Sequence, residues 1–112
     1  MAKVAEVNLE AGLPTVEAAL RKLKDALVTY KRTGCRAVVV VHGYGSSGVG
    51  GKIKPAVTAC LGDSSMSGLV KAQAGGEQWH YRKRELLAAC KELEAWERRI
   101  SNNEGVTVVI LK

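Results

Sequence analysis

The first third of the chain carries a hydrophobic pattern that predicts a strand, a helix and a second strand. Residues 4–9 alternate apolar and polar side chains, as in a short strand with one buried face. From Pro14 to about Arg32, apolar residues recur at steps of three and four and line one helical stripe. Gly34 can end this helix because glycine adopts the left-handed conformation without a Cβ clash. Residues 35–41 end in four consecutive valines, which predicts a central strand.

A second helix and a third strand are expected after a glycine-rich segment. Residues 52–61 place Ile53, Val57, Cys60 and Leu61 on one inward side. Proline is tolerated in a first helical turn, where its missing N–H has no partner to lose, so Pro55 predicts a helix start between Gly50 and Lys52. Residues 69–73 can form a third strand, parallel to the second if the intervening helix is a right-handed crossover.

The last third of the chain predicts one more helix and a closing strand. After residue 79 an apolar stripe is made by Leu86, Leu87, Cys90, Leu93 and Trp96. Residues 101–105 form a turn cluster, and residues 106–111 are rich in β-branched side chains. Alternating strands and helices predict the α/β class, and a length of 112 residues suits a single domain over residues 1–112.

Composition changes this picture in three ways. The formal net charge of +6 and the pI near 9.4 favour attraction to polyanions such as nucleic acid. Cys35, Cys60 and Cys90 form no C-x-x-C pair, so we expect core thiols in a reducing compartment. No segment is apolar enough over ~18 residues to span a bilayer. We therefore expect a cytoplasmic protein with no membrane partner.

The segment 42–54 holds the strongest candidate site, because five glycines fall within nine positions between a strand and a helix. So many glycines cost folding entropy, which indicates that the backbone must approach a ligand closely. Their N–H groups, the helix start and two lysines would favour an anion such as phosphate. The candidate phosphate or nucleic-acid contacts here are Gly43, Tyr44, Gly45, Ser46, Ser47, Gly48, Gly50, Gly51, Lys52 and Lys54.

Two familiar phosphate-binding loops fit these residues poorly. A Walker A loop is excluded because Ser46 replaces its first glycine and Ile53 replaces the hydroxyl residue that holds Mg²⁺. Residues 43–48 do spell G-x-G-x-x-G after a strand, as in dinucleotide-binding proteins. Two further glycines before the helix and a small number of strands argue against that interpretation.

Two residues are candidates for catalysis. His42 leaves the central strand where active-site groups of open α/β sheets gather, and an imidazole titrates near neutrality, as phosphodiester cleavage requires. The alternative is a histidine that only holds the loop in shape by hydrogen bonds. Glu10 follows the first strand and could supply a partner carboxylate for His42, or could be an exposed loop glutamate.

A second candidate surface is residues 79–84, where aromatic and cationic side chains interleave. This mixture stacks bases and contacts phosphates in proteins that bind single strands. Trp79 is expected to pack on the sheet instead. The candidate contacts are Arg82, Lys83 and Arg84, with a solvated helix face as the alternative.

Two motifs together resemble the Smr (small MutS-related) domain family. The sequence His42-Gly43-Tyr44-Gly45 is similar to its H-G-x-G loop, and residues 105–111 are similar to its G-V-T-V-V-x-L end. The resemblance runs from Val7 to Leu111. It implies a two-layer α/β sandwich with a β-α-β-α-β core and a mixed four-stranded sheet, similar to the C-terminal domain of translation initiation factor 3. It also implies that DNA or RNA is the partner, since several Smr domains nick DNA or cut RNA and others only bind.

The chain departs from the family pattern at three positions. Where the family has L-D-L-H-G at the end of its first strand, Asn8 replaces the acid and Glu10 replaces the histidine, and an extra residue precedes the glycine. Tyr44 replaces a residue that is usually Lys or Arg. These changes put endonuclease activity in doubt, together with the divalent metal that a nuclease could use.

Three functions remain open from the sequence. The first is a module that binds nucleic acid phosphates through residues 42–54, and the second is an endonuclease that uses His42. The third is a protein that binds small nucleotides or phosphometabolites and has no nucleic-acid activity. An exposed edge at the first or last strand would allow a homodimer.

Overall fold

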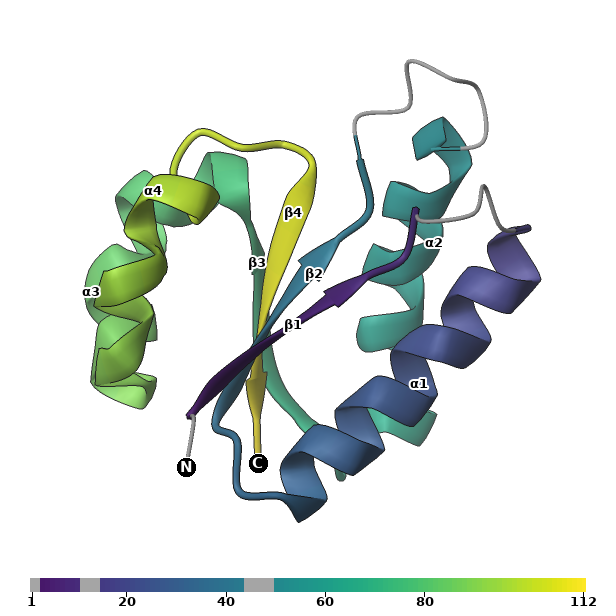
Figure 1. The fold of residues 1–112 in the computed structure, drawn as a ribbon, viewed down its shortest axis with the longest axis horizontal. Helices are drawn as coiled ribbons and strands as arrows, with labels where there is room; N and C mark the ends of the chain where they lie inside the picture. Colours follow the sequence, from purple (N-terminus) through teal and green to yellow (C-terminus); the bar gives the residue numbers. More distant parts are fainter. Residues whose placement is uncertain (1–2, 11–14, 44–49) are drawn as a thin grey trace.

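A computed structural model describes residues 3–10, 15–43 and 50–112 of the chain, and its core is a mixed four-stranded sheet (Figure 1). The strands are β1 (Val4–Asn8), β2 (Ala37–Val41), β3 (Val70–Gly75) and β4 (Val106–Leu111), in the order β1-β2-β4-β3. Strand β1 is parallel to β2, and β4 is antiparallel to both of its neighbours. Strand β3 therefore runs in the same direction as β2, as predicted, but β4 lies between them.

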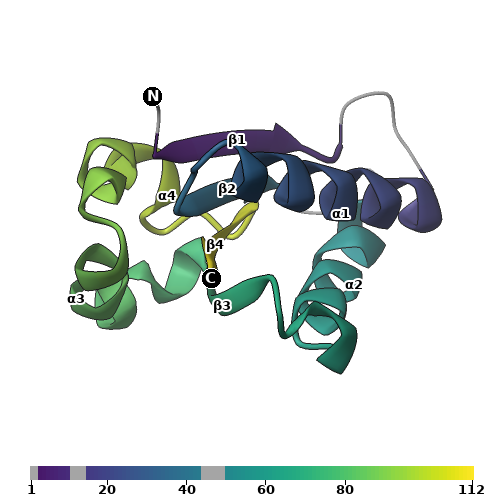
Figure 2. The ribbon, with the colours of Figure 1, turned by 90° about the horizontal axis from the view of Figure 1, so that it is seen from below.

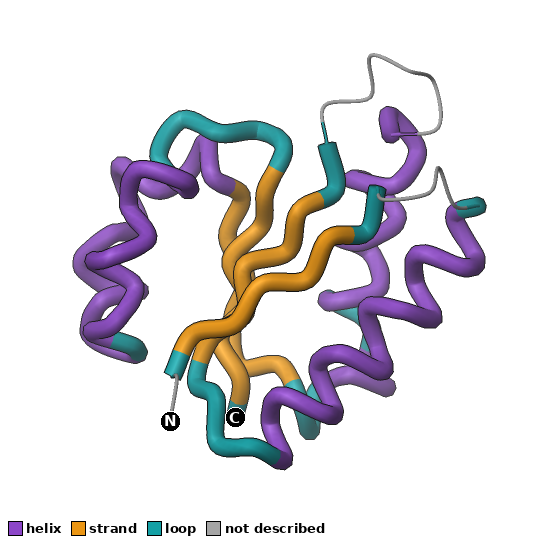
Figure 3. The backbone as a smooth tube through the Cα atoms, viewed as in Figure 1, coloured by secondary structure: helices purple, strands orange, loops and turns teal. Residues whose placement is uncertain are grey.

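Helices cover both faces of the sheet (Figures 2 and 3). Helices α1 (Val16–Arg32) and α2 (Gly50–Leu61) pack on one face, where Val38, Val40 and Val109 point. The other face is covered by α3 (Trp79–Ala89), the 3-10 helix η3 (Lys91–Trp96) and α4 (Glu97–Ile100). The α/β class and the mixed sheet are confirmed. The two-layer expectation left out this second helical layer, which packs on Val39, Val108 and Ile110.

Local chemistry explains the ends of helix α1. The hydroxyl of Thr15 accepts a hydrogen bond from the amide of Ala18 at 3.1 Å, which satisfies one of the free N–H groups of the first turn. At the other end Gly34 has φ of 93°, the left-handed conformation that favours glycine. The predicted helix and its glycine stop are confirmed.

Helix α2 begins at Gly50, within the predicted range, but Pro55 lies in its second turn rather than its first. Proline there removes one backbone hydrogen bond of the helix. The ring of Pro55 is exposed, so the helix accommodates it on its solvent side.

The predicted stripe from Leu86 to Trp96 does not form one helix. Helix α3 ends at Ala89, and Cys90 adopts an extended conformation with φ of −151° and ψ of 96°. The chain then continues as η3 and α4. Leu86, Cys90, Leu93 and Ile100 are all buried in the same cluster, so packing against the sheet outweighs the helical period across the break.

The sheet has β1 and β3 at its edges, and neighbouring side chains occupy main-chain carbonyls of both. The carbonyl of Asn8 accepts from Lys22 Nζ at 2.7 Å, and that of Glu6 accepts from the Tyr30 hydroxyl at 3.3 Å. On β3, Arg82 Nη1 donates to the carbonyl of Gln73 at 3.0 Å. Such contacts protect an edge from pairing with another chain. The last strand is interior rather than exposed, and a homodimer through β1 stays a prediction.

Candidate functional site

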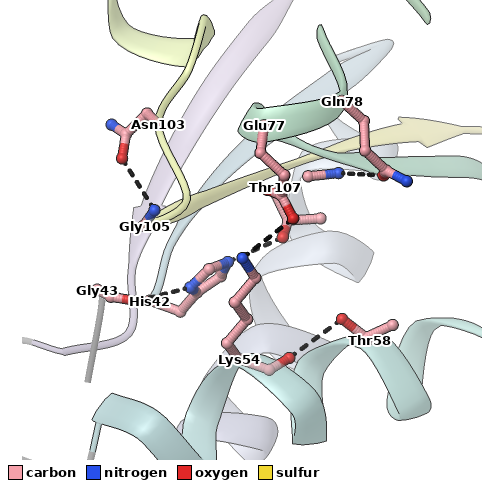
Figure 4. A network of polar contacts seen from close by, with 10 residues as sticks. His42, Gly43, Lys54, Thr58, Glu77, Gln78, Asn103, Gly105 and Thr107 are labelled. Atoms are coloured by element: carbon pink, nitrogen blue, oxygen red, sulfur yellow. Dashed lines mark hydrogen bonds and ion pairs between the residues drawn. The ribbon is translucent and has the colours of Figure 1, made fainter. Parts of the chain in front are cut away.

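The candidate site lies at the end of the sheet where β1, β2 and β3 finish and β4 begins. Glu10 and His42, the two predicted catalytic residues, follow the neighbouring strands β1 and β2. Glu77 follows β3 in the 3-10 helix η2 (Gly76–Gln78), and Thr107 stands near the start of β4 (Figure 4). Parallel strands bring their carboxyl ends to one edge, which explains why residues far apart in the sequence gather here.

His42 is completely buried and is bound through both ring nitrogens. Its Nδ1 lies 3.1 Å from the carbonyl oxygen of Gly43, and its Nε2 lies 2.8 Å from the hydroxyl oxygen of Thr107. A carbonyl oxygen can only accept, so Nδ1 carries the proton. In the neutral ring Nε2 then accepts from the Thr107 hydroxyl. Both hydrogen-bonding positions of the imidazole are therefore occupied inside the protein.

The surroundings of His42 keep it neutral at pH 7. Burial lowers the pKa of His42 below its ordinary value of 6.5, since the charged imidazolium would lose its hydration. The hydrogen bond to Gly43 raises this pKa, the ammonium of Lys54 lowers it, and the carboxylates of Glu77 and Glu10 raise it by smaller amounts. The contacts match the structural alternative, a histidine that holds the loop in shape. A catalytic role for His42 stays a prediction.

The backbone after His42 is bound to the turn before β4. The amides of His42 and Gly43 both donate to the carbonyl of Gly105, at 2.9 and 3.0 Å. The amide of Gly105 in turn donates to Oδ1 of Asn103 at 2.9 Å. These two loop amides therefore point into the protein, and Gly43 has no free N–H to offer a phosphate.

Gly43 also explains how Glu10 reaches this edge of the sheet. Its φ is 79°, and a Cβ on it would overlap the Oε2 atom of Glu10. The carboxylate of Glu10 therefore lies directly against the Gly43 backbone, while the residue as a whole is exposed. Proximity to His42 fits the predicted partner carboxylate and exposure fits the loop glutamate, so both interpretations of Glu10 remain.

An ion pair links the two helical layers across the end of the sheet. Lys54 Nζ, from α2, lies 3.1 Å from Oε2 of Glu77, from η2 on the other side (Figure 4). Lys54 has this carboxylate partner in the structure, and its predicted contact with phosphate stays a prediction. Lys52, in the first turn of α2, is exposed and has no ion pair with any residue that the structure describes.

Sequence reasoning missed Thr107 and Glu77. The sequence did contain a sign of Thr107, because it is the single polar residue within the apolar run 106–111. In the structure it lies buried in β4. No sequence feature indicated Glu77, because it is 23 positions from Lys54 and only the fold brings the two together.

The other predicted contacts are divided between two places. Tyr44, Gly45, Ser46, Ser47 and Gly48 lie outside the described residues. Gly50 and Gly51 open α2, where the N–H groups of the first turn have no acceptor within the helix. Arg82, Lys83 and Arg84 lie on α3, across the sheet from α2, so the structure does not bring them together with Lys52.

Within residues 3–10, 15–43 and 50–112, no group of three or more His, Cys, Asp or Glu side chains is placed to hold a metal ion. No helix in the described part is both long and apolar enough to cross a membrane. Cys35, Cys60 and Cys90 carry thiols rather than disulfides; Cys90 is buried in the core as predicted, whereas Cys35 and Cys60 are half-buried.

The model of the Smr domain family matches residues 11–83, more than half of the chain. The crystal structure of the Smr domain of MutS2 from Thermus thermophilus has a similar fold, with a TM-score of 0.60. That match covers 96% of this chain and 98% of the other at 24% sequence identity, so it is a likeness of fold. Comparison with curated proteins finds no match.

Proposed function

This chain belongs to the Smr domain family, and from that membership we propose that it binds nucleic acid, with phosphates held where helix α2 begins. The observation that carries the proposal is the position of Lys52. It extends from the first turn of α2 at the functional edge of the sheet, exposed and without an acidic partner in the described residues. The N–H groups of that turn add the partial positive charge of a helix N-terminus.

The charge of the whole chain supports the same proposal. A net charge of +6 attracts a polyanion at longer range and more strongly than a single lysine does. His42 serves this function as a positioning residue. By binding Thr107 and Gly43 it joins the start of the loop to β4, which sets where the chain leaves the sheet before α2.

We propose binding rather than cleavage as the principal activity. A general base must reach the proton that it removes, whereas His42 has no exposed surface and its Nε2 already accepts from Thr107. It stays a prediction that the chain is an endonuclease with His42 and Glu10 as catalytic residues. The use of a divalent metal also stays a prediction. Incubation with supercoiled plasmid, with and without Mg²⁺, tests them.

Binding is tested by fluorescence anisotropy with labelled DNA and RNA, each as a single strand and as a duplex. We expect an affinity that falls linearly in log–log form as salt rises from about 50 to 200 mM. The contrary result would be no binding at the lowest salt together with thermal stabilisation by free nucleotides, which would favour the small-nucleotide alternative.

The variant Lys52→Ala should weaken nucleic-acid binding and reduce the slope of log affinity against log salt by about 0.7 to 0.9, the effect of losing one phosphate contact. Titration of wild type and variant at several salt concentrations measures this. The matched control is Lys91→Ala, which removes an exposed lysine from η3, beside Glu92 and Glu94. Equal losses in the two variants would place the phosphates elsewhere.

A further inference from the structure

The side chains of three of the six residues 79–84 bind a glutamate, and the other three have no such contact among the described residues. Trp79 is buried, and its Nε1 donates to Oε2 of Glu97 at 2.7 Å. Arg82 binds Glu85, with its Nε 2.7 Å from Oε1. Lys83 pairs with Glu97, with 2.6 Å between Nζ and Oε2. Each of these three side chains thus has a carboxylate partner, although Lys83 itself is exposed.

The remaining three residues form what we call the Tyr81 patch: His80, Tyr81 and Arg84. Tyr81 is 82% exposed, so most of its aromatic ring is in contact with solvent. Arg84 is three positions after Tyr81 and four after His80, so helix α3 places the three side chains on one surface. Arg84 is exposed and forms no ion pair within the described parts of the chain.

The acidic residues nearest to this patch along the chain are neutralised by other partners. Glu85, four positions after Tyr81, has both carboxylate oxygens bound by Arg82, at 2.7 and 3.0 Å. Glu77, four positions before Tyr81, is paired with Lys54. Among the described residues, the exposed ring of Tyr81 therefore lies beside the guanidinium of Arg84, which has no carboxylate partner.

We infer that the Tyr81 patch is a stacking platform for an unpaired base, so that the chain binds single-stranded nucleic acid in preference to a duplex. The inference rests on the proposed function and names its substrate class. A phenol ring can stack on any base whose face is free, and a guanidinium alongside can contact the adjoining phosphate. A duplex hides its base faces, so only an unpaired strand can use both groups.

The experiment compares wild type with Tyr81→Ala and Tyr81→Phe, using a labelled single strand of about 16 nucleotides and the duplex of the same sequence. A third probe is an abasic strand, which keeps the phosphates and lacks the bases. Tyr81→Ala should bind the single strand about tenfold more weakly and bind the duplex and the abasic strand as wild type does. Tyr81→Phe should retain wild-type affinity because the ring remains.

Two control variants accompany these measurements. Val28→Ala removes the other large exposed apolar side chain of the described residues, on α1 across the sheet, and should change no affinity. Arg84→Ala should reduce the salt slope for the single strand by about 0.7, whereas Tyr81→Ala should leave that slope unchanged. The melting temperature of each variant verifies that it folds.

The outcomes separate this inference from the function on which it rests. If wild type binds neither strand nor duplex, the proposed function fails and the platform fails with it. If wild type binds and Tyr81→Ala binds the single strand equally well, only the platform is overturned. An equal loss for single strand, duplex and abasic strand would also overturn it, because stacking requires a base.

Discussion

Replacing His42 with alanine should lower the free energy of unfolding by about 3 kcal/mol. The change removes a fully buried ring and leaves a cavity beside β4. It also leaves the hydroxyl of Thr107 and the carbonyl of Gly43 without the ring nitrogens that they contact. Urea unfolding followed by circular dichroism measures the difference.

Two further variants serve as comparisons for His42→Ala. His80→Ala removes the other histidine of the chain, which is exposed on α3, and should change stability by less than about 0.5 kcal/mol. Thr107→Val removes only the hydroxyl partner of Nε2 and should cost about 1 to 2 kcal/mol. If His42→Ala cost as little stability as His80→Ala, the hydrogen bonds of His42 to Thr107 and Gly43 would not stabilise the fold.

The lowered pKa of His42 predicts a dependence of stability on pH. As the pH falls below the ordinary value of 6.5, the unfolded chain takes up a proton on His42 before the folded chain does. Stability should therefore fall with pH in that range, by at most about 1.4 kcal/mol per unit, until the folded-state pKa is reached. Unfolding curves between about pH 5 and 8 test this. The contribution should disappear in His42→Ala and remain in His80→Ala.

The second large effect is expected at Gly76, where alanine should cost about 3 kcal/mol or more. A Cβ on this buried residue would overlap the carbonyl oxygens of Asn103 and Ile100. Both are backbone atoms, so they cannot turn away as a flexible side chain could. The amide of Asn102 also donates to the carbonyl of Gly76 at 3.1 Å, which ties the two segments together.

Gly68→Ala is the matched control for Gly76→Ala. A Cβ at Gly68 would meet no atom within 4 Å, so stability should change by less than about 1 kcal/mol. Differential scanning calorimetry of both variants measures the contrast. Because Gly76 begins η2, its replacement should also displace Glu77 from Lys54. A Gly76→Ala variant as stable as wild type would show that η2 does not pack closely on the turn before β4.

Local pattern was sufficient to predict the elements that border the site. The valines before His42 predicted β2 because β-branched side chains suit a buried strand. The periodic stripe and Gly34 predicted α1 and its end, because both depend on residues within a few positions. The family, too, was identified from short motifs, and the match over residues 11–83 confirms it.

The predictions that were wrong or incomplete depended on distant residues. The helical stripe is interrupted at Cys90. The chain continues as the 3-10 helix η3 and then α4, and these place Leu93 and Ile100 against the sheet. The sequence did not predict that Lys54 pairs with Glu77 from the other helical layer, and its contact with phosphate stays a prediction. No spacing within 42–54 indicates that partner.

By itself, the sequence determined the four strands, the first two helices, the family and the set of polar residues from which a site can be built. The tertiary structure alone decided which of them face the solvent. His42 meets Thr107 from 65 positions away and becomes buried, whereas Tyr81 remains exposed on α3. The reason is physical: secondary structure follows from neighbours along the chain, but burial and charge pairing follow from elements that meet only when the sheet assembles.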